Sequence, residues 1–208
     1  MMSGLILAGG RNRGTNGEHK AFLVLDNMTF VERQIREMKK ICKEIIIVTN
    51  DPIPFLRKVD RGVRIITDYF PGKGPLSGMH AGLTLAQHPN VWVVGCDMPY
   101  ISAKAAELLI ERKQDGFEAV IPWVNHSAYP LHGVYDRSCA AAIGQLIEKD
   151  EVAVSALLKQ LFWCELQQSA FEEKGIDTRF VAAIKTTEEY EKLLAWHDSL
   201  KMNYLYGG

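Results

Sequence analysis

The sequence contains few cysteines and no long apolar run. Its four cysteines are widely scattered among 208 residues, and no two of them form a C-x-x-C pair. Thiols of this kind are typical of a reducing compartment rather than of a disulfide-stapled secreted fold. No apolar segment approaches the roughly 20 residues that a membrane-spanning helix needs. The apolar start ends in glycines and has no basic flank, unlike a signal peptide. We therefore expect a cytoplasmic protein that does not bind membranes.

An excess of either charge is also lacking. The formal net charge is −1, so the chain has no overall basic field of the kind that attracts nucleic acid. Any cation-rich site must therefore be local. Internal repeats, low-complexity segments and linkers are absent from the sequence as well. The length and a hydrophobic content of 47% are those of an ordinary globular domain, and we expect one domain over residues 1–208.

Short apolar runs alternate with segments of helical periodicity. Strands covered on both faces are predicted near residue 5 and at 45–49, 63–67, 91–95 and 119–121. The first predicted helix begins after the capping box of Thr29 and Glu32. Further helices are predicted near 77–85, 102–113, 139–148, 154–161 and 187–200. Residues 69–78 are predicted to form a loop. This alternation predicts an α/β fold with a mostly parallel central sheet flanked by helices.

The first strand opens into a loop rich in glycine and positive charge. Between residues 9 and 20 the chain carries four glycines and three cations, ending at Lys20. Backbone N–H groups and cations at one edge of a sheet suit a polyphosphate. The loop matches neither G-x-G-x-x-G nor the P-loop, because no two of its glycines are separated by a single residue and Lys20 is followed by alanine. A solvated surface loop would use the same residue types.

Polar side chains follow the later strands. Asn50 follows the second predicted strand, Asp68 ends the third and Asp97 comes directly after the fourth. Because ligands collect beyond the carboxyl ends of parallel strands, we expect one site at this edge. Asp97 is either a Mg²⁺ ligand beside substrate phosphates or a cap of the next helix, and Asp68 has the same two interpretations.

Four motifs in order resemble the molybdenum cofactor guanylyltransferase (MobA-type) family. They are Leu7-Ala8-Gly9-Gly10 with Lys20, Asp68 before Gly74-Pro75-Leu76-Ser77-Gly78, Gly95-Cys96-Asp97-Met98-Pro99, and Pro130-Leu131-His132-Gly133-Val134-Tyr135. The resemblance implies a Rossmann-like nucleotidyltransferase (GT-A-like) fold, with a nucleotide-binding half over 1–100 and an acceptor-binding half over 101–208. It implies transfer of GMP from GTP to molybdopterin-bound molybdenum, with release of pyrophosphate and use of Mg²⁺.

The resemblance also assigns site residues. Those expected to bind the nucleotide are Leu7, Ala8, Gly9, Gly10, Lys20, Asn50, Asp68 and Asp97. Lys20 and Asp97 are the expected catalytic residues, and Asp97 is the expected metal ligand. Transient contacts with cofactor-synthesis or acceptor proteins are expected of such an enzyme.

The chain departs from the family pattern in two places. Gly14-Thr15-Asn16 stands where the family has Arg-Met-Gly, and His19 replaces an acidic residue before the lysine. We hypothesise that Arg13, one position early, takes over the arginine's catalytic role. Near the C-terminus, Ala183 and Lys185 replace two asparagines.

These departures leave two other functions open. One is a related nucleotidyltransferase that acts on a sugar phosphate or another small phosphate. The other is a nucleotide- or cofactor-binding protein without turnover. We interpret His19, His80 and His132 as structural or surface histidines.

Overall fold

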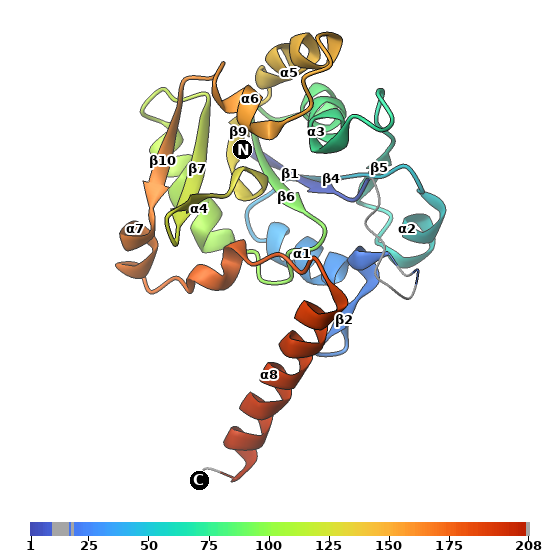
Figure 1. Cartoon of the computed structure of the whole chain (residues 1–208), viewed down its shortest axis with the longest axis vertical. Helices are drawn as coiled ribbons and strands as arrows, with labels where there is room; N and C mark the ends of the chain where they lie inside the picture. Colours follow the sequence, from blue (N-terminus) through green and yellow to red (C-terminus); the bar gives the residue numbers. More distant parts are fainter. Residues whose placement is uncertain (10–16, 18, 207–208) are drawn as a thin grey trace.

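A mostly parallel sheet forms the centre of the molecule (Figure 1). The computed structural model describes the backbone of residues 1–9, 17 and 19–206, and the side chains of these residues up to 199. In this part of the chain the sheet order is β10-β7-β9-β6-β1-β4-β5, with β8 paired to β7. The strands are Met2–Leu7 (β1), Glu44–Val48 (β4), Arg64–Ile66 (β5), Asn90–Gly95 (β6), Ala119–Val124 (β7), Ser127–Ala128 (β8), Val134–Asp136 (β9) and Trp163–Gln167 (β10). Strands β5, β4, β1 and β6 are parallel neighbours, and β9 runs against β6 and β7.

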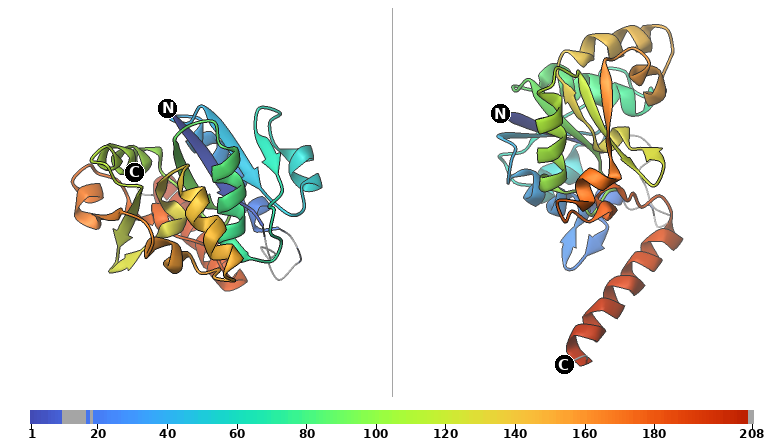
Figure 2. Two further views of the ribbon diagram at one scale, coloured as in Figure 1. Left: turned by 90° about the horizontal axis from the view of Figure 1, so that it is seen from above. Right: turned by 90° about the vertical axis from the view of Figure 1, so that its left-hand side faces the viewer.

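Helices cover both faces of this sheet (Figure 2). The α-helices of the described part of the chain are Phe30–Met38 (α1), Ile53–Lys58 (α2), Gly74–Leu85 (α3), Ala103–Lys113 (α4), Cys139–Glu148 (α5), Val154–Leu158 (α6), Gln168–Glu172 (α7) and Thr187–Tyr206 (α8). Strand β1 shows the two layers of the core, because its side chains alternate between them. Met2 and Ile6 pack with α1 and α4, whereas Leu5 and Leu7 pack with α3 and α5. The predicted α/β class is therefore confirmed.

Helix α3 lies unusually close to β1. A Cβ atom on Gly82 would be 2.3 Å from Leu5, and one on Gly78 would be 3.1 Å from Leu7. Glycine usually destabilises a helix interior, but here its small size allows this approach. The contact places the first turn of α3 beside the carboxyl end of β1.

The prediction of a loop over residues 69–78 is wrong for residues 74–78. Helix α3 begins at Gly74, so Gly74–Gly78 form its first turn. Pro75 is compatible with this position, because the first N–H groups of a helix have no intrahelical partner to lose. Strands β9 and β10 and helix α2 were not predicted, and α6 ends before the predicted residue 161.

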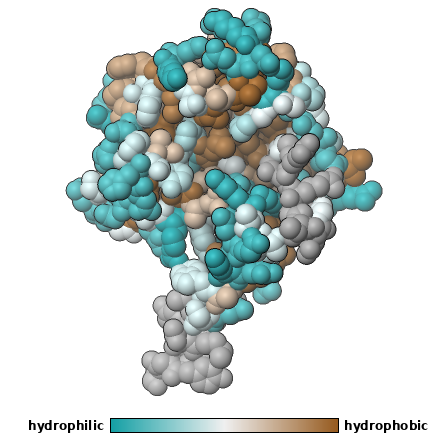
Figure 3. Space-filling view, in the orientation of Figure 1, coloured by the Kyte–Doolittle hydropathy of each residue, from teal (hydrophilic) through white to brown (hydrophobic). Residues whose placement is uncertain are grey.

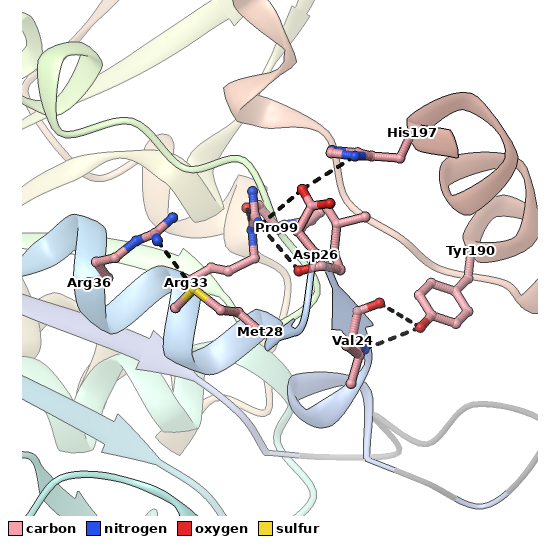
Figure 4. Close-up of polar contacts among 9 residues, drawn as sticks. Val24, Asp26, Met28, Arg33, Arg36, Pro99, Tyr190 and His197 are labelled. Atoms are coloured by element: carbon pink, nitrogen blue, oxygen red, sulfur yellow. Dashed lines mark hydrogen bonds and ion pairs between the residues drawn. The ribbon is translucent and has the colours of Figure 1, made fainter. Parts of the chain in front are cut away.

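A small hairpin and the C-terminal helix pack together below the sheet. Val24–Leu25 (β2) and Met28–Thr29 (β3) form the hairpin, and α8 leaves the body beside it (Figure 1). Tyr190 Oη donates to the carbonyl of Val24 at 2.7 Å, and His197 Nδ1 lies 3.3 Å from the Asp26 carboxylate. Figure 4 shows both contacts between the hairpin and α8. Within the described residues, no helix is long and apolar enough to cross a bilayer.

Candidate active site

One cavity of about 650 Å³ opens at the carboxyl ends of the parallel strands. This volume lies within the range of roughly 300–1,000 Å³ that is usual for small-molecule sites. On the face seen in Figure 3, apolar surface lies near the middle and is bordered by hydrophilic residues. The cavity is lined by Leu7, Gly9, Val48, Asn50, Asp68, Gly72, Gly74, Pro75, Gly78, Gly95, Asp97 and Leu131. The structure thus brings the strand-end residues together at the edge where the sequence predicts a site.

Asp97 lies in a tight turn just beyond β6. The N–H of Met98 donates to the carbonyl of Gly95 at 3.3 Å, and the N–H of Cys96 donates to the carbonyl of Leu7 at 3.0 Å. A Cβ atom on Gly95 would lie 2.7 Å from Asp97 Oδ1, so the carboxylate folds back over this glycine. Helix α4 is capped by Ser102, whose side chain accepts from the N–H of Ala105. The alternative that Asp97 caps the next helix is therefore wrong.

Gln34 anchors this turn from below. Its side chain is fully buried on α1, and its Nε2 donates to the carbonyls of Gly95 at 2.7 Å and Met98 at 2.9 Å. Gln34 is not among the site residues predicted from the sequence. A glutamine on the apolar face of a predicted helix was the available signal, because a buried amide requires hydrogen-bond partners.

Two lysines stand near the Asp97 carboxylate. Burial raises the pKa of Asp97, whereas the positive charges of Lys20 and Lys185 act in the opposite direction. Lys20 Nζ donates to the carbonyl of Lys185 at 2.7 Å, and the N–H of Ile184 donates to the carbonyl of Asp97 at 2.8 Å. The C-terminal segment that departs from the family pattern therefore lies against the Asp97 turn.

Asn50 and Asp68 complete the polar lining. Asn50 follows β4 and lies close to Gly9, which follows β1: a Cβ atom on Gly9 would be 3.8 Å from the side-chain amide nitrogen of Asn50. Both residues line the cavity. Asp68 Oδ1 is buried and has no hydrogen-bond partner among the described residues. Helix α3 begins after Lys73 without a side-chain cap, so Asp68 does not cap it either. A buried carboxylate oxygen without a donor is costly unless a ligand satisfies it.

Three other residues predicted for the site do not line the cavity or lie outside the described residues. Ala8 is buried and does not line the cavity, although its N–H donates to the carbonyl of Val48 at 2.8 Å. Gly10 and Arg13 lie outside the described residues. His132 is fully buried between Trp92 and Phe180, which lowers its pKa to about 3. Its interpretation as a structural histidine is confirmed.

The donors around the cavity suit a hard divalent cation. Asp68 and Asp97 offer carboxylate oxygens and Asn50 offers an amide oxygen, which are ligand types that Mg²⁺ and Mn²⁺ prefer. Among the described residues, no group of three or more His, Cys, Asp or Glu side chains could hold a metal ion. A cation here would need further oxygen ligands from substrate phosphates and water, as is usual for Mg²⁺.

A strand-end cavity with acidic residues, nearby lysines and the start of a helix defines a nucleotide-binding α/β protein. Residues 4–165 match the model of the MobA-like NTP transferase domain, and the chain belongs to this family. The protein is thus a nucleotidyltransferase.

Individual relatives agree in length and in fold. The molybdenum cofactor guanylyltransferase of Desulfosudis oleivorans is 30% identical over 191 residues, covering 92% of this chain and 93% of that protein. The structure of molybdopterin-guanine dinucleotide biosynthesis protein A from Archaeoglobus fulgidus matches with a TM-score of 0.79 at 20% identity, covering 95% of this chain and 99% of that one. A Mycobacterium tuberculosis protein in complex with manganese matches with a TM-score of 0.66 at 12% identity, covering 93% and 98% of the two chains.

Proposed function

We propose that the protein transfers GMP from GTP to the phosphate of a molybdopterin-type cofactor and releases pyrophosphate. The observation that carries the proposal is the convergence of Gly9, Asn50 and Asp97 with the first turn of α3 around one cavity. The names of the D. oleivorans and A. fulgidus relatives support this pair of substrates.

The reaction is a displacement at phosphorus. A terminal phosphate oxygen of the acceptor attacks the α-phosphorus of GTP and forms the new P–O bond. The bond between the α-phosphorus and the oxygen that bridges to the β-phosphorus breaks, and its electron pair leaves with pyrophosphate. A phosphate monoester with a second pKa of about 6 is already largely ionised at pH 7. The attacking oxygen therefore needs no general base, and we assign none.

The chain's contribution is positioning and charge neutralisation, which dominate phosphoryl-transfer catalysis. In this proposal the Lys20 ammonium binds the β- and γ-phosphates, and Lys185 adds positive charge nearby. Arg13, outside the described residues, is the third proposed cation. Backbone N–H groups after β1, at Gly9 and Gly10, are further proposed phosphate contacts, and Gly10 lies outside the described residues.

Asp97 is the proposed ligand of Mg²⁺, with Asp68 facing the same cavity. A divalent ion there supplies charge neutralisation at the transferred phosphate when it is bound. The manganese complex of the M. tuberculosis neighbour supports a divalent ion for this fold. Burial disfavours the ionised form of Asp97 and raises its pKa, so a bound cation would stabilise the carboxylate.

The start of α3 is the proposed guanine subsite. The first N–H groups of a helix have no intrahelical partner, so that of Leu76, directly after Pro75, is proposed to donate to the O6 atom of guanine. The carbonyl of Gly72, which precedes the helix and lines the cavity, is proposed to accept from N1–H and the exocyclic amine. A site matched to these groups should reject adenine strongly, because its buried polar groups would stay unpaired.

The test is pyrophosphate release from GTP, ATP, CTP and UTP, each with molybdopterin cofactor or a sugar phosphate as acceptor. We expect pyrophosphate release only when GTP is combined with the molybdopterin cofactor. We also expect GTP to raise the Tm of the protein more than ATP does. Release with a sugar phosphate instead would favour the related nucleotidyltransferase. GTP binding without release for any acceptor would contradict the transfer proposed here.

A further inference from the structure

The histidine before Lys20 joins the two ends of the glycine-rich loop. His19 Nε2 lies 2.9 Å from the carbonyl oxygen of Ala8, which directly follows β1. His19 Nδ1 accepts a hydrogen bond of 3.2 Å from the N–H of Ala21. The imidazole of His19 therefore bonds to a residue 11 positions earlier, at the start of the loop, and to a residue just after the end of the loop.

These two partners define the protonation state of the ring. A backbone N–H can donate but not accept, so Nδ1 must keep its lone pair. A backbone carbonyl can accept but not donate, so Nε2 must carry the hydrogen. His19 is therefore assigned as the neutral Nε2–H tautomer from its hydrogen-bond partners.

Aromatic side chains hold the ring in place. Its centroid lies 5.2 Å from Phe55 of α2, edge to face, and 5.8 Å from Phe22. The two phenylalanines are themselves 4.8 Å apart, and the Lys58 ammonium lies over Phe22. The imidazole is thus packed against a buried aromatic group rather than turned freely toward solvent.

The same residue starts the turn that carries the phosphate-binding lysine. Residues Lys20–Phe22 form a 3₁₀ helix, and His19 is its N-cap through the bond from Ala21. Lys20 is the first residue of this turn, so its backbone position follows from the cap. Its ammonium then reaches the carbonyl of Lys185 beside Asp97.

We propose that His19 is a positioning residue that closes the phosphate loop and sets Lys20 toward the triphosphate. The inference rests on the proposed function, in which Lys20 binds the β- and γ-phosphates. An ionised acidic residue, which the family carries at this position, could accept from Ala21 but could not donate to Ala8. The bond to Ala8 is therefore a feature that the histidine adds.

Three substitutions separate the two hydrogen bonds. His19→Asn keeps an acceptor for the N–H of Ala21, since asparagine is a good N-cap. His19→Gln keeps a donor that extends toward Ala8, and His19→Ala keeps neither group. His126→Asn is the matched control, because His126 is exposed in the β7–β8 turn with a φ of 59° that asparagine tolerates.

We expect His19→Ala to raise the KM for GTP about tenfold, equivalent to roughly 1.4 kcal/mol. The kcat should fall less, because the phosphate contact already exists in the ground state. His19→Asn and His19→Gln should each restore part of the loss, and His126→Asn should match the wild type. A KM for GTP that is unchanged in His19→Ala would overturn the inference.

Two spectroscopic measurements do not depend on turnover. Nitrogen NMR of the wild type at neutral pH should show His19 with a protonated Nε2 and an unprotonated Nδ1. The Ala21 amide should exchange slowly in the wild type and in His19→Asn, and faster in His19→Ala and His19→Gln. An Nδ1–H tautomer, or equal Ala21 exchange in all four proteins, would overturn the proposed closure of the loop.

Lys20→Ala distinguishes a failure of this inference from a failure of the proposed function. If Lys20→Ala keeps the wild-type KM for GTP, the phosphate-binding role of Lys20 is wrong, and the positioning role of His19 falls with it. If Lys20→Ala loses GTP binding while His19→Ala does not, the inference about His19 alone is wrong.

Discussion

The side-chain amide of Gln34 donates to the carbonyl of Gly95 at 2.7 Å, which links the buried face of α1 to the end of β6. The same nitrogen reaches the carbonyl of Met98 at 2.9 Å. Asp97 lies between these two carbonyls in sequence, so a residue that does not line the cavity holds the turn that presents the acid. The core of the protein and its site are thus connected through one amide group.

Gln34→Glu should therefore destabilise the protein and impair transfer. At neutral pH the change removes both hydrogen bonds and turns a negative charge toward two carbonyl oxygens. The unsatisfied carbonyls and the buried charge together should lower the free energy of unfolding by roughly 2–4 kcal/mol. Urea unfolding measures this loss, with Gln160→Glu as an exposed control. Equal unfolding midpoints for the two variants would show that the anchor does not stabilise the fold.

Asp97→Asn should retain little transfer, because a neutral amide is a poor Mg²⁺ ligand, and it should stabilise the protein. Burial is the largest cause of the raised pKa of Asp97, so its ionised form destabilises the native state at neutral pH. A raised pKa means that the native state binds more protons than the unfolded state. Stability from Asp97 is therefore present at low pH and is lost as the pH rises through its native pKa. The gain in Tm on substitution to Asn should grow with pH and vanish in acid.

Activity should change with pH in the opposite direction. Metal binding requires the ionised carboxylate, so transfer should decline on acidification at a pH above the ordinary Asp value of 3.8. Asp198→Asn, on the exposed side of α8, is the control and should alter neither profile. Turnover near the wild-type rate in Asp97→Asn would exclude Asp97 as the metal ligand.

Gly82→Ala should destabilise the protein through steric overlap. A Cβ atom at this position would lie 2.3 Å from one methyl of Leu5 and 2.4 Å from the other, so α3 or the leucine must move. Overpacking of this kind costs roughly 1–3 kcal/mol. Gly144→Ala on α5 is a milder control, since its nearest contact would be His80 at 3.4 Å. Thermal unfolding should show the larger loss in Gly82→Ala, and an equal or smaller loss would refute close packing of α3 on β1.

The position of the site at the carboxyl edge of the sheet could be predicted from the sequence. The residues that hold this site in place from behind could not. Asn50, Asp68 and Asp97 each follow a buried apolar run, and the shared direction of parallel strands is enough to bring such residues together. The first turn of α3 was predicted as a loop, because glycine and proline favour loops and first helical turns alike.

The contacts made by Gln34 and His19 could not be predicted from local patterns. Gln34 contacts residues 61 and 64 positions later in the chain, and which residues face it depends on how α1 packs on the sheet. Strand β9 was missed because three residues between turns carry too little periodicity to identify a strand.

Lys185→Ala and Arg13→Ala should each slow transfer. In our hypothesis, Lys185 and Arg13 together supply the positive charge that the family arginine would otherwise provide around the triphosphate. Lys185 is exposed, yet its charge acts on Asp97 from the segment that Lys20 contacts. A unit charge about 4 Å from a phosphate is worth about 4 kcal/mol at an effective dielectric near 20. Loss of one such stabiliser should lower kcat by roughly 10²–10³.

Lys185→Asn, which introduces the family residue, separates the charge of this side chain from its polarity. If charge matters, Lys185→Asn should be as slow as Lys185→Ala, and added salt should narrow the difference from the wild type. Arg11→Ala and Lys192→Ala are the controls and should retain wild-type kcat, the latter because Lys192 is an exposed residue of α8. If Lys185→Ala, Arg13→Ala and Arg11→Ala all have the same kcat, the idea of compensating charge fails. If the wild type also binds GTP weakly, a nucleotide-binding protein without turnover then becomes the better account.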